Sequence, residues 1–325
     1  MSSPWCRTPW PPPFAAEPEG TADADMDSLC LEFFGAEISV STTTGDVSDL
    51  EFLFGPHVVP DSGAADRLRV EFGYPRPGHS VSGDAWAELV VRRDDGPPLL
   101  RRAFRGWSNV PPPVPPFSVL RERFSLVQAV VLAKGGTTVA LIGSPHSDRE
   151  GVALALAQRS WRIVSGQLLI TDRTDGNVMP YHVPLEFRGA TAVGLRAAGL
   201  APGTWTSRTS PLTGEVLMVR PEALGDIVPI RARLGPPELF RLCRSGNEGA
   251  RLEPWDFPTQ TWPPEAAAEM ADVPSFRLEL PESGGAEEAA GLIDHRMTSE
   301  RRELCPDVPV TGRASPAGST ASLLI

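Results

Sequence analysis

Residues 137–158 read TTVALIGSPHSDREGVALALAQ, and this stretch decides the fold. The apolar, β-branched run Thr137–Gly143 predicts a strand, and the spacing of apolar residues in Val152–Gln158 predicts a helix. The loop between them lies where a phosphate-binding P-loop would lie, because that motif, G-x-x-x-x-G-K-[ST], also joins a strand to a helix. The stretch therefore predicts an α/β protein.

The loop lacks the groups with which a P-loop binds a nucleotide. Those groups are glycines that let backbone N–H groups surround the phosphates, a lysine that contacts them, and a hydroxyl that binds Mg²⁺. Gly143 is retained, but the next three positions of the motif carry Asp148, Arg149 and Glu150. Two carboxylates in the place of a polyphosphate argue against nucleotide binding. We interpret the loop as a vestigial anion or nucleotide site made of Gly143, Ser144, Ser147 and Arg149.

Residues 126–185 resemble the core of the HPr serine kinase family in the order and spacing of their motifs. Ala153–Leu156 (ALAL) matches the family's helix and Arg159–Arg162 (RSWR) its R-G-x-R turn, whereas Gln128 replaces a histidine. The family's acidic pair, which serves as metal ligand and general base, falls on Gly166 and Gln167, and neither residue can ionise. The resemblance implies a kinase-like framework that has lost its working residues.

The fold class that follows is α/β, with a mixed, twisted sheet around the strand–loop–helix and a mainly β region before it. Along the chain we expect a disordered lead at 1–26, a β-rich region at 27–108, a proline-rich connector at 109–117, the kinase-like core at 118–280 and a mostly disordered tail at 281–325.

Shorter signals predict individual elements. Strands of an antiparallel layer are expected at 30–34, 37–41, 50–54, 68–72, 86–92 and 99–104. The lone lysine, Lys134, opens a Lys-Gly-Gly hairpin turn, and Asp172–Gly176 is expected to form another turn. Strands are also expected at Val178–Leu185 and Ile230–Arg233, and an amphipathic helix at Pro237–Arg244.

Composition limits the classes of function. The 325 residues are enough for one large or two modest domains, and a net charge of −11 argues against a nucleic-acid-binding surface. The sequence shows no signal peptide and no apolar run of membrane-spanning length, so we expect a cytoplasmic protein without membrane contact. The four cysteines and five histidines lack metal-ligand spacing, so no metal and no cofactor is expected.

Three local patterns have more than one interpretation. The aromatic residues Trp255, Phe257 and Trp262 lie among prolines, and such residues either dock a partner or cover the edge of a core. His146 lies between two serines, as in an activated nucleophile or as an ordinary loop residue. Asp172 is either a displaced kinase acid or the first residue of a turn.

Taken together, these signals predict a non-catalytic binding or scaffold protein with an HPr-kinase-like fold. The resemblance implies a protein or peptide partner, namely a precursor peptide or the enzyme that modifies it in peptide natural-product biosynthesis. The alternative is an atypical ATP- or GTP-dependent serine kinase in which Arg149 takes over from the P-loop lysine.

Overall fold

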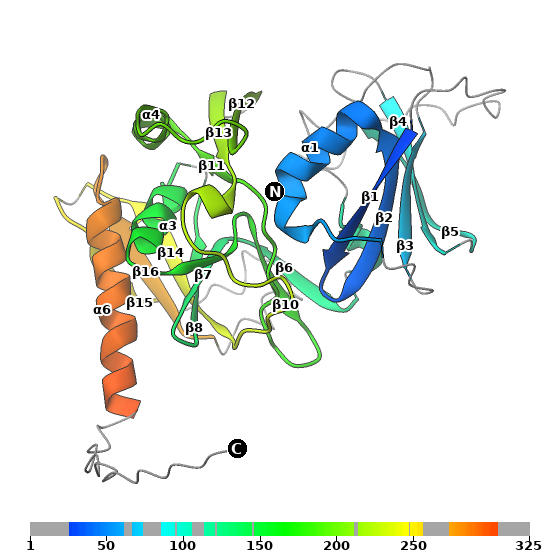
Figure 1. Ribbon diagram of the computed structural model, residues 1–325. Coiled ribbons are helices and arrows are strands. Elements are labelled where there is room, and N and C mark those ends of the chain that lie inside the picture. Colours follow the sequence, from blue (N-terminus) through cyan, green and yellow to red (C-terminus); the bar gives the residue numbers. More distant parts are fainter. Residues whose placement is uncertain are drawn as a thin grey trace, which may run out of the picture.

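The computed structural model describes residues 26–61, 67–73, 86–94, 96–105, 114–120, 122–144, 146–210, 214–246, 248–255 and 273–304. Two lobes follow each other along the chain: an N-terminal lobe up to residue 105 and a core lobe from residue 122 (Figure 1). The chain mixes helices with parallel and antiparallel strands, so the predicted α/β class is confirmed.

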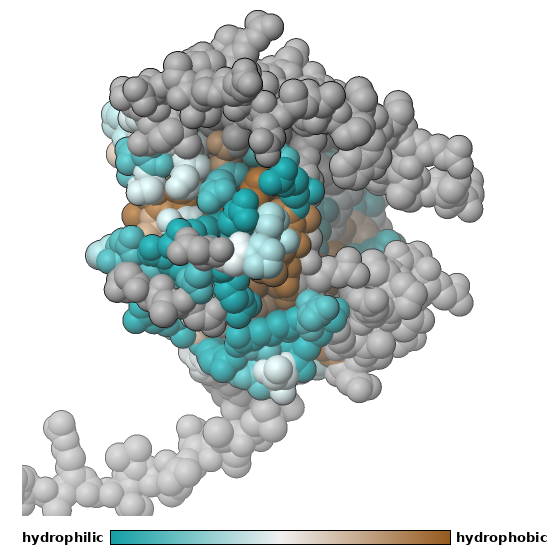
Figure 2. Space-filling view, turned by 90° about the vertical axis from the view of Figure 1, so that its right-hand side faces the viewer, coloured by the Kyte–Doolittle hydropathy of each residue, from teal (hydrophilic) through white to brown (hydrophobic). Residues whose placement is uncertain are grey.

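The N-terminal lobe is one five-stranded sheet in the order β1-β2-β3-β4-β5 with a helix packed on it. Its elements are β1 (Met26–Phe33), β2 (Ala36–Thr43), α1 (Thr44–Phe54), β3 (Leu68–Gly73), β4 (Trp86–Arg93) and β5 (Pro98–Arg105). Seen from the side of this lobe, hydrophilic residues cover much of the described surface, with hydrophobic ones visible between them (Figure 2).

Two predictions for this lobe are wrong. The expected strand at 50–54 is the second half of α1, where Leu50 and Phe54 stand one helical turn apart and are both buried. The expected antiparallel layer is a mixed sheet, because β2 and β3 run parallel and α1 joins them. A short apolar segment fits both the two-residue period of a strand and the 3.6-residue period of a helix. Here the segment packs against the sheet as a helix.

The core lobe is built on a six-stranded sheet in the order β15-β16-β14-β8-β7-β9. Its strands are β7 (Val130–Lys134), β8 (Thr137–Ile142), β9 (Arg162–Ser165), β14 (Pro237–Arg244), β15 (Arg251–Pro254) and β16 (Ser275–Leu280). Strands β7 and β8 form the hairpin predicted from Lys134, with Gly135 and Gly136 both at positive φ in its turn.

The helix predicted at Pro237–Arg244 is wrong, because these residues form strand β14. It pairs parallel with β8 on one side and with β16 on the other, at the centre of the sheet. Leu239 and Phe240 are adjacent in sequence, point to opposite faces and are both fully buried. A strand buried on both faces has no polar alternation, so its apolar residues resemble a helical pattern.

Two helices pack together beside this sheet: α3 (Arg149–Gln158) and α6 (Ala286–Leu304) (Figure 1). The buried face of α6 includes Ala290 and Ile293, which join the same hydrophobic cluster as Val152 and Leu156 of α3. The disordered tail expected from residue 281 is therefore wrong as far as Leu304; residues 305–325 lie outside the described part of the chain.

Smaller sheets complete the core lobe. Strand β6 (Phe124–Gln128) pairs with β10 (Leu168–Asp172), and the strands β11 (Leu185–Phe187), β12 (Trp205–Ser210) and β13 (Gly214–Val219) form a three-stranded sheet beside α4 (Gly189–Ala197). The short helices are α2 (Phe117–Leu120), η1 (Gly55–His57) and η2 (Pro221–Ala223). The strands expected at 178–185 and 230–233 are loops: of these residues, Val178 and Tyr181 form isolated bridges and Leu185 begins β11.

The two lobes share a continuous hydrophobic cluster. Phe33 and Phe34 of β1 and its turn pack against Tyr181 of the core lobe, at ring-centroid distances of 5.9 and 6.5 Å. Next to them the backbone N–H of His182 donates to Nε2 of His57 at 2.9 Å. This shared core holds the lobes against each other.

Candidate functional site

The loop between β8 and α3, residues 143–150, is closed by its own side chains. The Ser147 hydroxyl donates to the Ser144 carbonyl oxygen at 2.8 Å, and the backbone N–H of Ser147 donates to the same oxygen at 3.0 Å. A Cβ atom added to Gly143 would lie 2.2 Å from the Ser147 hydroxyl oxygen, so only glycine fits there. The structure thus brings together the predicted residues Gly143, Ser144 and Ser147, in contact with one another.

Arg149 points into the protein. Its Nε donates to the Glu150 carboxylate at 2.7 Å, its Nη1 lies 3.5 Å from the Gly143 carbonyl oxygen, and its side chain is only 6% exposed. Burial raises the pKa of Glu150, while the Arg149 guanidinium acts in the opposite direction. Arg149 is therefore the partner of a buried carboxylate and does not extend toward the solvent as a P-loop lysine would.

Asp148 has a backbone conformation that is typical of glycine. Its φ of 60° and ψ of 32° are left-handed, a conformation that glycine adopts without strain and that Asp tolerates better than most residues. Its carboxylate accepts from the Thr191 hydroxyl at 3.4 Å and pairs with Arg244 at 3.4 Å. Burial raises the pKa of Asp148, and Arg244 opposes that shift.

A hollow of about 400 Å³ lies over the start of α3, bounded by β11, the start of α4 and the end of β14. Three of its lining residues carry carboxylates: Asp148, Glu150 and Glu186. They are balanced by arginines, since Glu186 pairs with Arg188 at 2.8 Å and also with Arg208. The protein's own carboxylates thus occupy the end of α3 where the helix dipole would favour a bound anion.

The sequence did not point to Glu186, Arg188 or Arg244 as neighbours of the loop. They come from β11 and β14, and their proximity depends on the parallel placement of β14 beside β8. No local motif carries that information, because each residue is an ordinary charged residue at the end of a strand.

Gly166 and Gln167, where the resemblance placed the acidic pair, make structural contacts. A Cβ atom on Gly166 would lie 2.5 Å from the Val183 carbonyl oxygen, and the Gln167 side chain donates to the Pro184 carbonyl oxygen at 3.2 Å. Gln128 is exposed at the end of β6. Neither slot of the acidic pair thus offers a group that could act as a general base or bind a metal ion.

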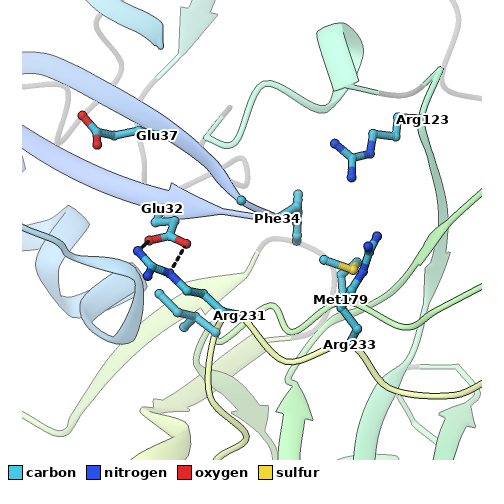
Figure 3. Close-up of a pocket in the computed structure, with 9 residues that line it drawn as sticks. Glu32, Phe34, Glu37, Arg123, Met179, Arg231 and Arg233 are labelled. Atoms are coloured by element: carbon cyan, nitrogen blue, oxygen red, sulfur yellow. Dashed lines mark hydrogen bonds and ion pairs between the residues drawn. The ribbon is translucent and has the colours of Figure 1, made fainter. Parts of the chain in front are cut away.

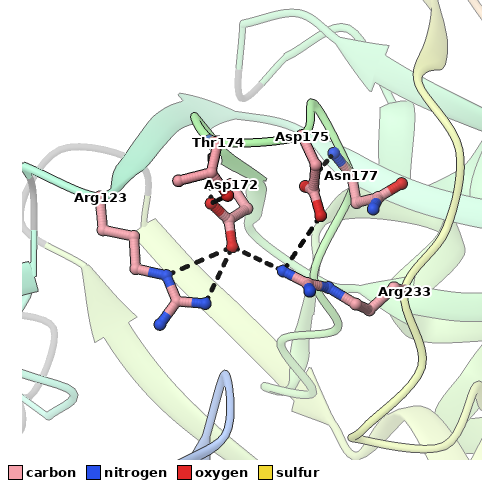
Figure 4. A network of polar contacts seen from close by, with 6 residues as sticks. All are labelled: Arg123, Asp172, Thr174, Asp175, Asn177 and Arg233. Carbon is pink, nitrogen blue, oxygen red and sulfur yellow. Dashed lines mark hydrogen bonds and ion pairs between the residues drawn. The ribbon is translucent and has the colours of Figure 1, made fainter.

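Asp172 is the centre of a polar network, which favours the turn interpretation over a displaced catalytic acid (Figure 4). Thr174 donates to Oδ1 through its backbone N–H at 3.0 Å and its hydroxyl at 2.7 Å. Arg123 and Arg233 donate to Oδ2, at 3.0 and 2.7 Å. Burial raises the pKa of Asp172, but these hydrogen bonds outweigh it and hold the pKa below its usual value.

His146 is exposed and lies at the rim of the hollow. Of the predicted docking aromatics, Trp255 is half-buried, with the Arg241 guanidinium 5.0 Å from its ring centroid. Phe257 and Trp262 lie outside the described residues, so partner docking at this place stays a prediction.

Within the described ranges one group of side chains has metal-ligand proximity: Cys30, Glu37 and Asp61. Arg67 already supplies positive charge there, with its Nη1 2.5 Å from Asp61 and 3.6 Å from Glu37. Burial and the neighbouring Glu37 carboxylate raise the pKa of the Cys30 thiol to about 11.

No family model matches this sequence, and no curated protein matches it. Among solved structures, the chain is similar to the HPr(Ser) kinase/phosphatase from Coxiella burnetii, with 12% identity and a TM-score of 0.29. The match covers 55% of this chain and 98% of that one. None of the described helices combines the length and the apolar character needed to cross a lipid bilayer.

Proposed function

We propose that this chain is a non-catalytic binding protein, a pseudo-kinase that recognises a precursor peptide or holds a peptide-modifying enzyme. The observation that carries the proposal is the closure of the loop at 143–150 by its own side chains. Ser147 occupies the space beside Gly143, and the Arg149 side chain is turned back onto Glu150. A nucleotide phosphate would have to displace both contacts.

Electrostatics support the same proposal. The hollow over α3 is lined by the carboxylates of Asp148, Glu150 and Glu186. Each of these carboxylates is paired with an arginine of the protein. A bound phosphate would therefore have to compete with these carboxylates for the arginines.

The motif resemblance supplies the nature of the partner. A framework that resembles the HPr kinase family without its acidic pair suits retention for binding a peptide or protein, which is the substrate class of that framework. Peptide or protein recognition needs no titratable base, so the loss of function at Gly166 and Gln167 is compatible with it.

The test is a melting experiment with ATP or GTP and Mg²⁺, on the wild type and on Arg149→Met. A ligand at a hundred times its Kd stabilises by about 2.7 kcal/mol, which shifts the melting temperature by about 4 °C in a protein of this size. We expect no shift in either protein. A nucleotide-dependent rise in the wild type that is lost in Arg149→Met would contradict the proposal and establish the kinase alternative.

A pull-down with the full chain as bait addresses the partner directly. Candidate precursor peptides and modifying enzymes, each expressed with a tag, are tested for retention without added nucleotide. We expect retention of at least one of them to be unaffected by ATP with Mg²⁺. Retention only in the presence of nucleotide would argue for a catalytic role.

A further inference from the structure

A second cleft, of about 600 Å³, opens between the two lobes (Figure 3). The β1–β2 turn forms one wall with Glu32, Phe34, Gly35 and Glu37. The other wall belongs to the core lobe: Arg123, Met179, Ile230, Arg231 and Arg233. We call this space the interlobe cleft; its volume falls within the range of peptide- and ligand-binding pockets, roughly 300–1,000 Å³.

Two arginines of the core wall are held in position by the Asp172 network. Asp172 is completely buried, and its Oδ2 accepts from Nε and Nη2 of Arg123 and from Nη2 of Arg233 (Figure 4). The side chains of Arg123 and Arg233 remain 53% and 46% exposed. Their positions are thus set by a buried carboxylate, while large parts of both guanidinium groups face solvent.

Arg123 and Arg233 keep guanidinium N–H groups that are available to a ligand. Arg123 uses Nε and Nη2 for Asp172, and Arg233 uses Nη2 for Asp172 and Asp175. No hydrogen-bond acceptor among the described residues engages Nη1 of Arg123, or Nε and Nη1 of Arg233, although the Arg123 guanidinium also lies 5.0 Å from the Phe124 ring centroid. Preorganised guanidinium groups with available N–H groups match the planar, two-oxygen geometry of a carboxylate.

The β1–β2 wall of the cleft carries Glu32 and Glu37, but arginines offset their repulsion of a bound carboxylate. Arg231 binds Glu32 through Nε at 2.7 Å and Nη2 at 2.6 Å, and Arg67 lies 3.6 Å from Glu37. Figure 3 shows Phe34 between the two glutamates on one side and Arg123 and Arg233 on the other. Phe34 and Met179 also line the cleft, but they are core residues that are only 5% and 4% exposed.

We propose that the interlobe cleft binds a peptide segment through a carboxylate held by Arg123 and Arg233. The proposal rests on the proposed function, since it names the place and the chemistry of peptide recognition. The competing internal acid is Asp175, 3.2 Å from Arg233 and at the protein surface, which the ligand's carboxylate joins or displaces.

The probes are two fluorescein-labelled mixtures of hexapeptides with random apolar sequence. One mixture ends in Glu with a free C-terminal carboxylate; the other ends in Gln with a C-terminal amide. Fluorescence anisotropy with the full chain is expected to show at least tenfold tighter binding of the carboxylate mixture, and this preference weakens as salt is raised. Equal binding of the two mixtures, or no binding of either, would overturn the proposal.

The variants are Gly35→Asp and its isosteric control Gly35→Asn. Gly35 lines the cleft at φ +80°, and an added Cβ meets nothing within 4 Å, so both variants carry the same backbone strain and differ only in charge. We expect Gly35→Asp to weaken carboxylate binding about tenfold relative to Gly35→Asn. Equal affinities of these two variants would exclude the cleft as the site.

Arg233→Gln and Arg233→Lys test the guanidinium itself. Both variants are expected to bind the carboxylate mixture about tenfold or more weakly than the wild type. Arg233→Lys is expected to bind more tightly than Arg233→Gln, because lysine keeps the positive charge but lacks the two-pronged geometry of the guanidinium group. Arg196→Gln is the matched control, since Arg196 forms a comparable surface pair with Glu215 on α4 and β13. A loss in Arg196→Gln as large as in Arg233→Gln would mean a nonspecific charge effect and would overturn the proposal.

The failure of this inference is distinguishable from failure of the proposed function. If the wild type retains a partner in the pull-down and Gly35→Asp and Arg233→Gln retain it equally, the chain binds a partner elsewhere and the cleft inference is wrong. If ATP or GTP instead raises the melting temperature of the wild type, the proposed function is wrong whatever the peptide mixtures do.

Discussion

At the level of a single residue, Asp148 has a left-handed backbone at the start of α3. A left-handed residue other than glycine carries strain of about 1 kcal/mol, and Asp148 is held there at φ 60° by Thr191 and Arg244. These contacts of its carboxylate offset strain that a glycine would not have. A glycine at this position alone is not expected to create a phosphate site, because Glu150 and Glu186 still line the hollow.

Asp148→Gly and Asp148→Ala separate strain from side-chain contacts. Both variants lose the same carboxylate, but only alanine keeps the left-handed penalty, so we expect Asp148→Gly to be about 1 kcal/mol more stable than Asp148→Ala. Urea denaturation measures the difference. Equal stabilities would mean that the backbone relaxes to another conformation in the alanine variant.

The buried pair of Arg149 and Glu150 gives a second prediction. Arg149→Met leaves the Glu150 carboxylate buried without its partner, and we expect a loss of about 3 kcal/mol in the free energy of unfolding. The double variant Arg149→Met with Glu150→Gln is expected to lose less than the single one, because no unpaired charge remains. Additive losses in a double-mutant cycle would show that the two side chains do not interact.

At the level of elements, the carboxylate of Asp294 is one of the contacts that tie helix α6 to the core sheet. Asp294 Oδ1 accepts from Lys134 Nζ at 2.7 Å and from the indole N–H of Trp161 at 2.8 Å. Burial raises the pKa of Asp294, but these two donors outweigh it and keep the pKa below its usual value. Trp161 is almost completely buried, so Asp294 is its link to the helix.

Asp294→Ala is therefore expected to destabilise the protein by about 1–3 kcal/mol, because the buried indole N–H loses its acceptor. Lys134→Met should cost less, since the Lys134 side chain is partly exposed and the Trp161 hydrogen bond survives. Chemical denaturation of both variants decides the order. A larger loss for Lys134→Met would assign the stabilisation to the ion pair.

The elements also show how far the sequence predicts the structure. The strand–loop–helix at 137–158 and the Lys134 hairpin have strong local signals, and both are confirmed. Strand β14 has none, because a strand buried on both faces lacks polar alternation. The contacts of the loop with Arg244 and Glu186 follow from the placement of β14 and β11, so a local pattern cannot reveal them.

On the scale of the whole molecule, the lobes meet at a pair of buried histidines. His57 accepts the N–H of His182 at Nε2, so its proton is on Nδ1, which donates to the Glu32 carbonyl oxygen at 2.8 Å. Nε2 of His182 lies 2.6 Å from the Val228 carbonyl oxygen. Burial lowers the pKa of His57 from 6.5 to about 3, and it also lowers the pKa of His182.

The lobe interface is therefore expected to weaken in mild acid. In the unfolded chain His57 is protonated below about pH 6.5, whereas in the folded protein it stays neutral until about pH 3. The free energy of unfolding therefore falls as the pH drops from about 6.5 toward 3. His57 contributes up to about 1.4 kcal/mol per pH unit in this window, and His182 acts in the same direction. Glu150 and Asp148, whose pKa values are raised, act with the opposite sign nearer their own pKa values.

Melting temperatures between pH 7.5 and 5 measure this slope, and histidine NMR signals identify the groups. We expect the His57 signal to stay in its neutral form throughout that range. His295→Gln, which removes an exposed histidine on α6, is the control and should leave the slope unchanged. A melting temperature that does not depend on pH would show that water reaches the two rings at the interface and that burial does not lower their pKa values.

The central position of β14 also dictates the order in which the protein is completed during synthesis. All strands of the N-terminal sheet have been synthesised once Arg105 has left the ribosome. Strand β8, in contrast, lacks its parallel neighbour until Pro237–Arg244 has been synthesised. Strand β14 in turn lacks its second neighbour until Ser275–Leu280 has been synthesised. Pairing between strands so distant in sequence is slow, and an apolar strand edge left open in a nascent chain favours aggregation. A chain interrupted before residue 237 therefore exposes β8, the strand that leads into the closed loop.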